Sequence, residues 1–149
     1  MKKSIFLVVL GLIWVVFPVT MASSHCEIPC GIYDDHMRVD MIAEHIATIE
    51  KSMNQIRKLQ EEKPIDYNQL VRWIMNKEAH ADQVQEIVTQ YFMTQRIKAD
   101  TKDYEKKLSL LHQLLVVAMK CKQTTDLSNT QKLRTLLKQF EGLYFGHTH

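Results

Sequence analysis

The chain has 149 residues, with 19 Lys and Arg against 17 Asp and Glu, and it has only 4 Gly and 3 Pro. This length suits one domain, and the shortage of turn-forming residues disfavours a turn-rich β fold. The near-neutral charge and the lack of a basic stretch argue against nucleic acid as a partner.

Residues 1–24 have the pattern of a secretory leader. Two lysines precede an apolar run over residues 5–19, and small residues follow it. The run holds about fifteen residues, short of the ~20 that a membrane-spanning helix needs. Because Ala22 and Ser24 fit the small-residue rule of a cleavage site, we expect a signal or leader peptidase to cut after Ser24. The mature protein then starts at His25 and is exported, to the periplasm or beyond it, without a membrane anchor; an uncleaved anchor is the alternative.

Residues 25–33, His-Cys-Glu-Ile-Pro-Cys-Gly-Ile-Tyr, predict a loop, because Pro and Gly stand close together in the segment. After cleavage, the amine of His25, the backbone nitrogen and thiolate of Cys26 and the thiolate of Cys30 can surround a metal in one plane, with the His25 ring at an axial position. Planar nitrogen and sulfur donors suit Ni(II) or Cu(II), whereas Zn(II) prefers a tetrahedron and Mg(II) or Ca(II) prefer oxygen. Such donors favour a redox site. Spacing alone leaves a Cys26–Cys30 disulfide as an equal alternative.

The rest of the chain, residues 34–149, begins with two amphipathic segments of helical period. Asp34 or Asp35 can cap the first segment, and Asp66, with Gln69 three residues later, can cap the second. The apolar positions of the first segment are Val39, Ile42, Ile46, Ile49, Met53 and Ile56. Those of the second, interrupted by Lys77, are Leu70, Trp73, Ile74, Ala81, Val84, Val88 and Tyr91.

Two further segments complete the pattern. The third is expected to begin near Asp100 or Thr101, and its two apolar rows predict burial on more than one side. The fourth is expected to begin with a capping box at residues 128–131, and its apolar positions are Leu133, Leu136, Leu137, Phe140 and Tyr144. Four amphipathic helices with short connections predict an all-α fold, an antiparallel four-helix bundle from which the loop at 25–33 projects.

The loop resembles the metal-binding hook of the nickel-containing superoxide dismutases, which has the pattern H-C-x-x-P-C-G-x-Y. The matching positions are His25, Cys26, Pro29, Cys30, Gly31 and Tyr33. The resemblance implies an enzyme that converts superoxide to oxygen and hydrogen peroxide, with one nickel ion per subunit cycling between Ni(II) and Ni(III). It also implies that the subunits assemble as a homohexamer.

The resemblance further assigns roles to residues of the hook. The amine and ring of His25, the amide and thiolate of Cys26 and the thiolate of Cys30 are implied as nickel ligands. Tyr33 is implied to line the approach of superoxide to the metal. The Ile28–Pro29 peptide bond is implied to be cis, as suits a tight turn.

Outside the hook, the resemblance implies a carboxylate that orients the axial imidazole. Asp40 is the expected match, and Glu44 is the alternative. Some family members pair this carboxylate with an Arg on the second helix; this chain has His80 there. A histidine can still hydrogen-bond a carboxylate, but it replaces a permanent charge by a titrating one, and the sequence leaves the role of His80 open.

Other candidate ligands have simpler interpretations. Cys121 lies in an apolar row and is predicted to be a small core residue. His36, His45 and His112 have no partner at metal-ligand spacing and are expected at the surface or at a subunit interface.

Two other functions remain open from the sequence. One is an exported nickel or copper carrier that uses the same hook without catalysis, although a carrier gains nothing from Tyr33. The other is a structural helical bundle with a Cys26–Cys30 disulfide.

Overall fold

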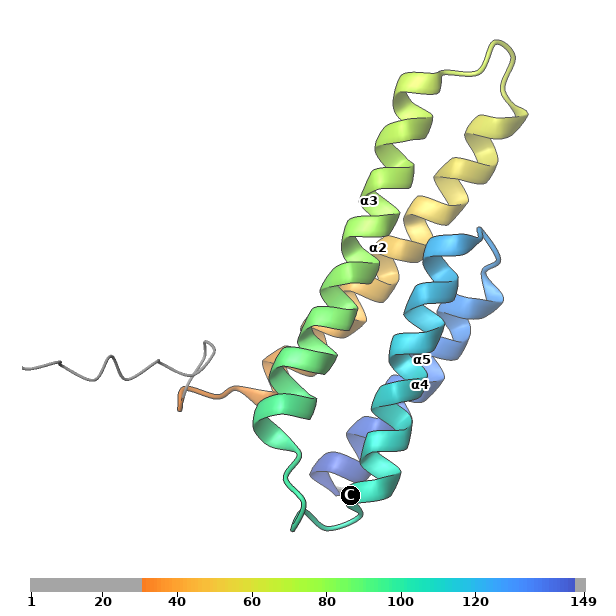
Figure 1. Ribbon diagram of the computed structural model, residues 1–149. Helices are drawn as coiled ribbons and strands as arrows, with labels where there is room; N and C mark the ends of the chain where they lie inside the picture. Colours follow the sequence, from red (N-terminus) through yellow and green to blue (C-terminus); the bar gives the residue numbers. More distant parts are fainter. Residues whose placement is uncertain (1–30, 147–149) are drawn as a thin grey trace, which may run out of the picture. The chain divides into compact units, whose positions relative to one another are not determined.

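The computed structural model describes residues 31–146; residues 1–30, which include the leader and most of the hook, and residues 147–149 lie outside the described residues. The described chain is helical and contains no strand. Its elements are α2 (Asp35–Glu61), α3 (Tyr67–Glu86), the π-helix η1 (Ile87–Arg96) that continues α3, α4 (Tyr104–Gln123) and α5 (Ser128–Phe145) (Figure 1). The predicted all-α bundle is therefore confirmed for this part of the chain. None of its helices is both long and apolar enough to cross a membrane.

The helices form two antiparallel hairpins, α2 with α3 and α4 with α5, packed side by side (Figure 1). The α2–α3 hairpin extends beyond the ends of α4 and α5, at the end of the bundle opposite the start of α2. The first turns of α3 are therefore covered only by α2. For this reason Ile74, predicted to be buried, is 39% exposed, while Leu70 and Trp73 are only half-buried.

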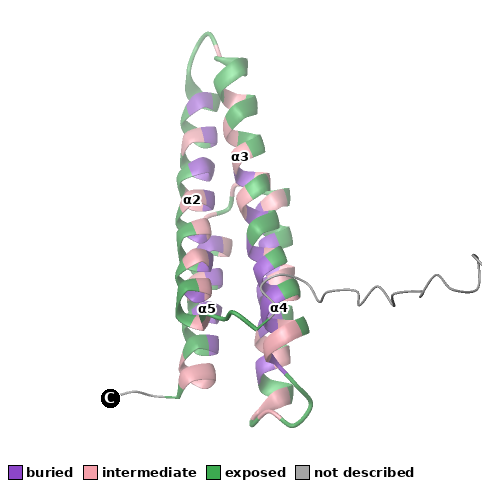
Figure 2. Ribbon diagram, turned by 90° about the vertical axis from the view of Figure 1, so that its left-hand side faces the viewer, coloured by how far each residue is buried: buried purple, intermediate pink, exposed green. Residues whose placement is uncertain are grey.

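The apolar positions predicted for α2 form the centre of the core. All six of them are buried, and buried residues follow the inner faces of the helices (Figure 2). The first four positions predicted for α5 are buried too, and Tyr144 is half-buried. The heptad-like spacing in the sequence thus predicted correctly which helix faces pack together.

Two of the predicted helix caps are confirmed. The Met37 amide donates to the Asp34 carboxylate at 2.9 Å, so Asp34 rather than Asp35 caps α2. At the start of α3, the backbone amide of Gln69 donates to the Asp66 carboxylate at 3.1 Å. Both caps satisfy backbone amides that the first helical turn leaves without a partner.

Two helix starts differ from the prediction. α4 begins at Tyr104, after a turn that ends at Asp103 with a left-handed φ of 56°, and so it starts later than Asp100 or Thr101. Ser128 is not the cap of α5; its amide and hydroxyl both donate to the Asp126 carboxylate, at 2.9 and 2.8 Å. An Asp two residues before a Ser can accept hydrogen bonds from the backbone amide and the hydroxyl of that Ser in a local turn. Asp126 therefore takes the hydrogen bonds of Ser128 at the start of α5.

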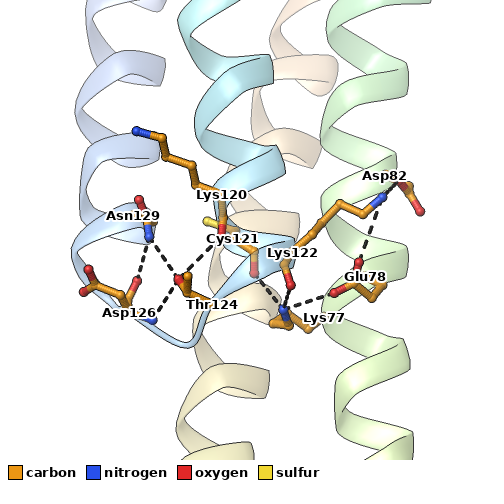
Figure 3. Close-up of polar contacts among 9 residues, drawn as sticks. All are labelled: Lys77, Glu78, Asp82, Lys120, Cys121, Lys122, Thr124, Asp126 and Asn129. Carbon is orange, nitrogen blue, oxygen red and sulfur yellow. Dashed lines mark hydrogen bonds and ion pairs between the residues drawn. The ribbon is translucent and has the colours of Figure 1, made fainter.

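Lys77, the polar interruption of the α3 stripe, is only 4% exposed. Its ammonium group donates to the backbone carbonyls of Cys121, at 2.8 Å, and of Lys122, and it forms an ion pair with Glu78 at 3.1 Å (Figure 3). Both carbonyls lie in the last turn of α4, where helical partners are missing. Lys77 therefore links α3 to the C-terminal end of α4.

Candidate active site

The predicted ligands His25, Cys26 and Cys30, and the Ile28–Pro29 bond predicted to be cis, lie outside the described residues, whereas Tyr33 lies within them. Gly31 has a φ of 78°, which favours glycine. Three residues of chain span at most about 11 Å between the Cα atoms of Cys30 and Tyr33. Covalent connection alone therefore keeps Tyr33 near the predicted ligand Cys30.

Tyr33 is held by two side chains of η1. The guanidinium carbon of Arg96 lies 4.3 Å from the centroid of the Tyr33 ring. The ring of Tyr91 meets it edge-on, with centroids 5.9 Å apart and planes at 77°. Tyr33 is nevertheless 39% exposed. A cation–π contact of this kind contributes about 0.5–1 kcal/mol at an exposed site, so Tyr33 is oriented but remains accessible to solvent.

Asp35, the first residue of α2, joins three elements through its carboxylate. It accepts two hydrogen bonds from Arg96, through Nε and Nη2 at 2.8 Å each, in a two-pronged ion pair. It also accepts the hydroxyl groups of Tyr91 at 2.5 Å and of Tyr144, on α5, at 2.8 Å. We refer to Asp35, Tyr91, Arg96 and Tyr144 as the Asp35 cluster. From the sequence, Asp35 was expected only as a possible helix cap.

The charges in the Asp35 cluster support one another. Burial alone would raise the pKa of Asp35, but the hydrogen bonds from Arg96, Tyr91 and Tyr144 and the charge of Arg96 outweigh it, and the net shift is downward. Burial and the hydrogen bond to Asp35 raise the pKa of Tyr91, and they raise that of Tyr144 to about 12. Both phenols therefore stay protonated at neutral pH and act as hydrogen-bond donors to an ionised Asp35.

The π-helical geometry of η1 brings Tyr91 and Arg96 to the same carboxylate. Residues five apart point about 140° away from each other on an α-helix, whereas the i to i+5 repeat of a π-helix places them on one side. The Ile97 amide, for example, bonds the Phe92 carbonyl five residues earlier, at 2.9 Å. The α-helical stripe predicted from the sequence ends at Tyr91 and therefore gives no position for Arg96.

Asp40 and Glu44, the carboxylates predicted to orient the axial imidazole, are both exposed. Neither side chain forms a hydrogen bond or ion pair with another described residue. Their role toward the His25 ring therefore stays a prediction. Within the described residues, Asp35 is the first carboxylate after the hook in sequence that several donors hold in place.

Within residues 31–146, the hydrogen-bond partner of His80 is another histidine and not a carboxylate. Its Nδ1 lies 2.8 Å from Nδ1 of His45, and the two rings are half-buried between α3 and α2. One Nδ1 must carry a proton and the other must accept it. Burial lowers the pKa of His45, and the charge of His80 lowers it further. His45, expected at the surface or at an interface, is half-buried where α2 meets α3, because the register of the α2–α3 hairpin pairs it with His80.

The other candidate ligands lie apart from one another. Cys121 is fully buried, and burial raises the pKa of its thiol to about 11, which confirms it as a core residue that stays protonated. The ring of His36 stacks on Phe145, with centroids 3.8 Å apart. Among residues 31–146, no three His, Cys, Asp or Glu side chains gather closely enough to hold a metal ion.

The sequence model of one protein family, described as nickel-containing superoxide dismutase, matches residues 20–148. The match includes the whole of the predicted hook and the helical bundle behind it. Neither a curated protein nor a solved structure matches the chain. Because the match covers most of the sequence, the chain belongs to the nickel-containing superoxide dismutase family, and it is an oxidoreductase that uses nickel to convert superoxide to oxygen and hydrogen peroxide.

Proposed function

We propose that the nickel of this superoxide dismutase is held at the mature N-terminus. The donors are the amine and imidazole of His25, the backbone nitrogen and thiolate of Cys26, and the thiolate of Cys30. When bound there, nickel supplies the one-electron couple that oxidises one superoxide ion and reduces another. The observation that carries this placement is the covalent continuity from Cys30 to Tyr33, which Arg96 and Tyr91 hold in a defined orientation.

The chemistry of the donor set fits nickel. Two nitrogens and two thiolates would suit Ni(II) better than Zn(II), which prefers tetrahedral sites. The third cysteine does not compete for the metal, because Cys121 is buried and its thiol stays protonated. Nothing found in the comparisons supports the alternative of a non-catalytic carrier.

The side chains beyond the ligands have separate tasks in this proposal. Tyr33 lines the approach of superoxide, since it is exposed and lies three residues from a ligand. The Asp35 cluster holds the base of the hook in place against the bundle. Because the phenols of Tyr91 and Tyr144 hold their protons tightly, we assign them to this anchoring and not to proton supply. Asp40, or Glu44 in its place, remains the proposed partner of the His25 ring.

Processing and assembly are also part of the proposal. A free amine at His25 requires removal of residues 1–24, by a signal or leader peptidase, which implies export to the periplasm or beyond. Residues 25–33 then form the hook, and residues 34–149 form the bundle. Assembly into a homohexamer is supported by the exposed apolar side chains of Tyr67, Val71 and Met75 on α3, since patches of this kind commonly mark subunit contacts.

The test is mass spectrometry, N-terminal sequencing and metal analysis of the natively processed protein. We expect a chain that begins at His25, carries one nickel per subunit and dismutates superoxide. A chain that begins at Ser24 with nickel and activity intact would overturn the ligand set. Bound nickel without activity would indicate a carrier, and a mass lower by two hydrogen atoms without metal would indicate the Cys26–Cys30 disulfide.

A further inference from the structure

Each ring of the Tyr33–Tyr91 pair has a guanidinium group over it. Arg96 lies over Tyr33, and Arg38, from the first turns of α2, lies over Tyr91 with its guanidinium carbon 5.1 Å from the ring centroid. The start of α2 and the η1 segment lie at the same end of the bundle (Figure 1). Arg38 therefore belongs to the same surroundings as Tyr33, only two contacts away from it.

The two guanidinium groups differ in how their charge is compensated. Arg96 is neutralised by the two-pronged ion pair with Asp35. Arg38 forms no ion pair within residues 31–146. Its Nη1 donates only to the sulfur of Met41, at 3.8 Å, and thioether sulfur is a weak acceptor.

One donor of Arg38 has no acceptor in the part of the chain that the structure describes. Its Nε is buried and has no hydrogen-bond partner there. Buried donors without partners are rare because they lose their hydration without compensation, so each one calls for a ligand or a functional reason. Arg38 as a whole is only half-buried, and a guanidinium that lies over an aromatic ring without a counter-charge among residues 31–146 is suited to a small anion.

The chemistry of the reaction identifies the anion that matters. Superoxide carries one negative charge, whereas oxygen and hydrogen peroxide are neutral. A fixed positive charge beside the approach therefore attracts the substrate without retaining either product. Asp40 and Glu44, which follow on the same helix and are exposed, would repel superoxide, and the charge of Arg38 offsets them.

We propose that Arg38, seated over Tyr91, forms a binding site for small monovalent anions and collects superoxide for the metal. This inference rests on the proposed placement of nickel in the hook, because that placement puts the ligand Cys30 three residues before Tyr33 in the chain. Arg38 is a specificity-determining residue in this scheme and not a nickel ligand.

The kinetic test compares Arg38→Gln, Arg38→Lys and Arg38→Glu with Arg72→Gln. Arg72 is exposed on α3, near the opposite end of the bundle, and its change removes the same charge. At low ionic strength we expect Arg38→Gln to lower the second-order rate by about 2- to 10-fold and to weaken its dependence on salt. Arg38→Glu should lower the rate further, Arg38→Lys should restore most of it, and Arg72→Gln should leave rate and salt dependence unchanged. A wild-type rate and salt dependence in Arg38→Gln would overturn the proposal.

Nickel content separates this inference from the placement of the metal. We expect Arg38→Gln to carry as much nickel as wild type. A loss of nickel in proportion to the loss of rate would overturn the anion site, because Arg38 would then only support the hook. Failure of the wild-type hook to bind nickel would count against the proposed placement instead.

A binding measurement on the metal-free full chain is independent of activity. Sodium azide supplies a small linear monoanion, and the Arg38 Nε–H resonance reports its binding by nuclear magnetic resonance. We expect a saturable shift of this resonance and no comparable shift of the Arg72 resonance. Equal, non-saturating shifts at both residues would show only general ionic-strength effects and would overturn the site.

Discussion

Arg96 binds Asp35 through Nε and Nη2, each at 2.8 Å, and so joins the end of η1 to the start of α2 across 61 positions of sequence. The same guanidinium lies over the ring of Tyr33. One side chain therefore both closes the bundle and orients the residue that leads into the hook. The contact that joins η1 to α2 thus also fixes the orientation of Tyr33.

Asp35→Asn is expected to lower the free energy of unfolding by about 2–3 kcal/mol, because it leaves a half-buried Arg96 without a counter-charge. Urea unfolding followed by circular dichroism measures the loss. Asp34→Asn is the matched control, since Asn caps a helix about as well as Asp, and it should change stability by less than about 0.5 kcal/mol. Equal effects of the two variants would contradict the anchoring role of Asp35.

The lowered pKa of Asp35 predicts a dependence of stability on acid. Its contribution is complete above the unfolded-state value, near 3.8, and is lost as the pH falls through the lower folded-state pKa. Wild type should therefore lose stability below about pH 4 more steeply than Asp35→Asn. Parallel curves of unfolding free energy against pH for the two proteins would show that Asp35 does not carry this shift.

The His45–His80 pair predicts a second dependence, at higher pH. Because the pKa of His45 is lowered in the folded state from 6.5, the unfolded chain binds the proton more tightly. The unfolding free energy should thus fall as the pH drops from about 6.5 towards the folded-state pKa. His45→Gln should reduce this fall, and His112→Gln, exposed on α4, should not. The prediction fails if both variants retain the wild-type slope.

The three cysteines should separate into two classes. Cys26→Ser and Cys30→Ser are each expected to abolish dismutase activity while the helical circular dichroism and the melting temperature stay the same. Cys121→Ser should keep its activity but lose about 1–3 kcal/mol of stability, because it places a hydroxyl group in the core. Activity in either hook variant would contradict the proposed ligands.

His25→Gln is expected to keep nickel and to lose most of its turnover. The amine, the Cys26 amide and both thiolates remain, so metal analysis should find wild-type nickel. The imidazole that His25 would donate to the metal is lost, so the electron-spin resonance signal of Ni(III) should weaken. Wild-type turnover in this variant would show that His25 matters only through its amine.

The helical body was predictable from the sequence because its determinants are local. The seam from Val39 to Ile56 repeats every three or four residues, and Asp34 and Asp66 cap amides only three residues away. The hook motif is local as well, because nine consecutive residues carry it, and these residues are enough to indicate the family. The capping box predicted at Ser128 was wrong, because the backbone amide and the hydroxyl of Ser128 both donate to Asp126.

The surroundings of the hook depend on tertiary structure. Asp35 and Tyr144 are 109 positions apart, and no spacing rule relates them. The π-helical repeat of η1 brings Tyr91 and Arg96 to one side, and the register of the α2–α3 hairpin sets His45 against His80. Periodicity determines which face of each helix is buried. Which polar groups meet between the helices depends on the length of each helix, on its α- or π-helical repeat and on the register of its packing. Sequence periodicity does not contain this information, because contacts between distant residues form only when the whole bundle packs.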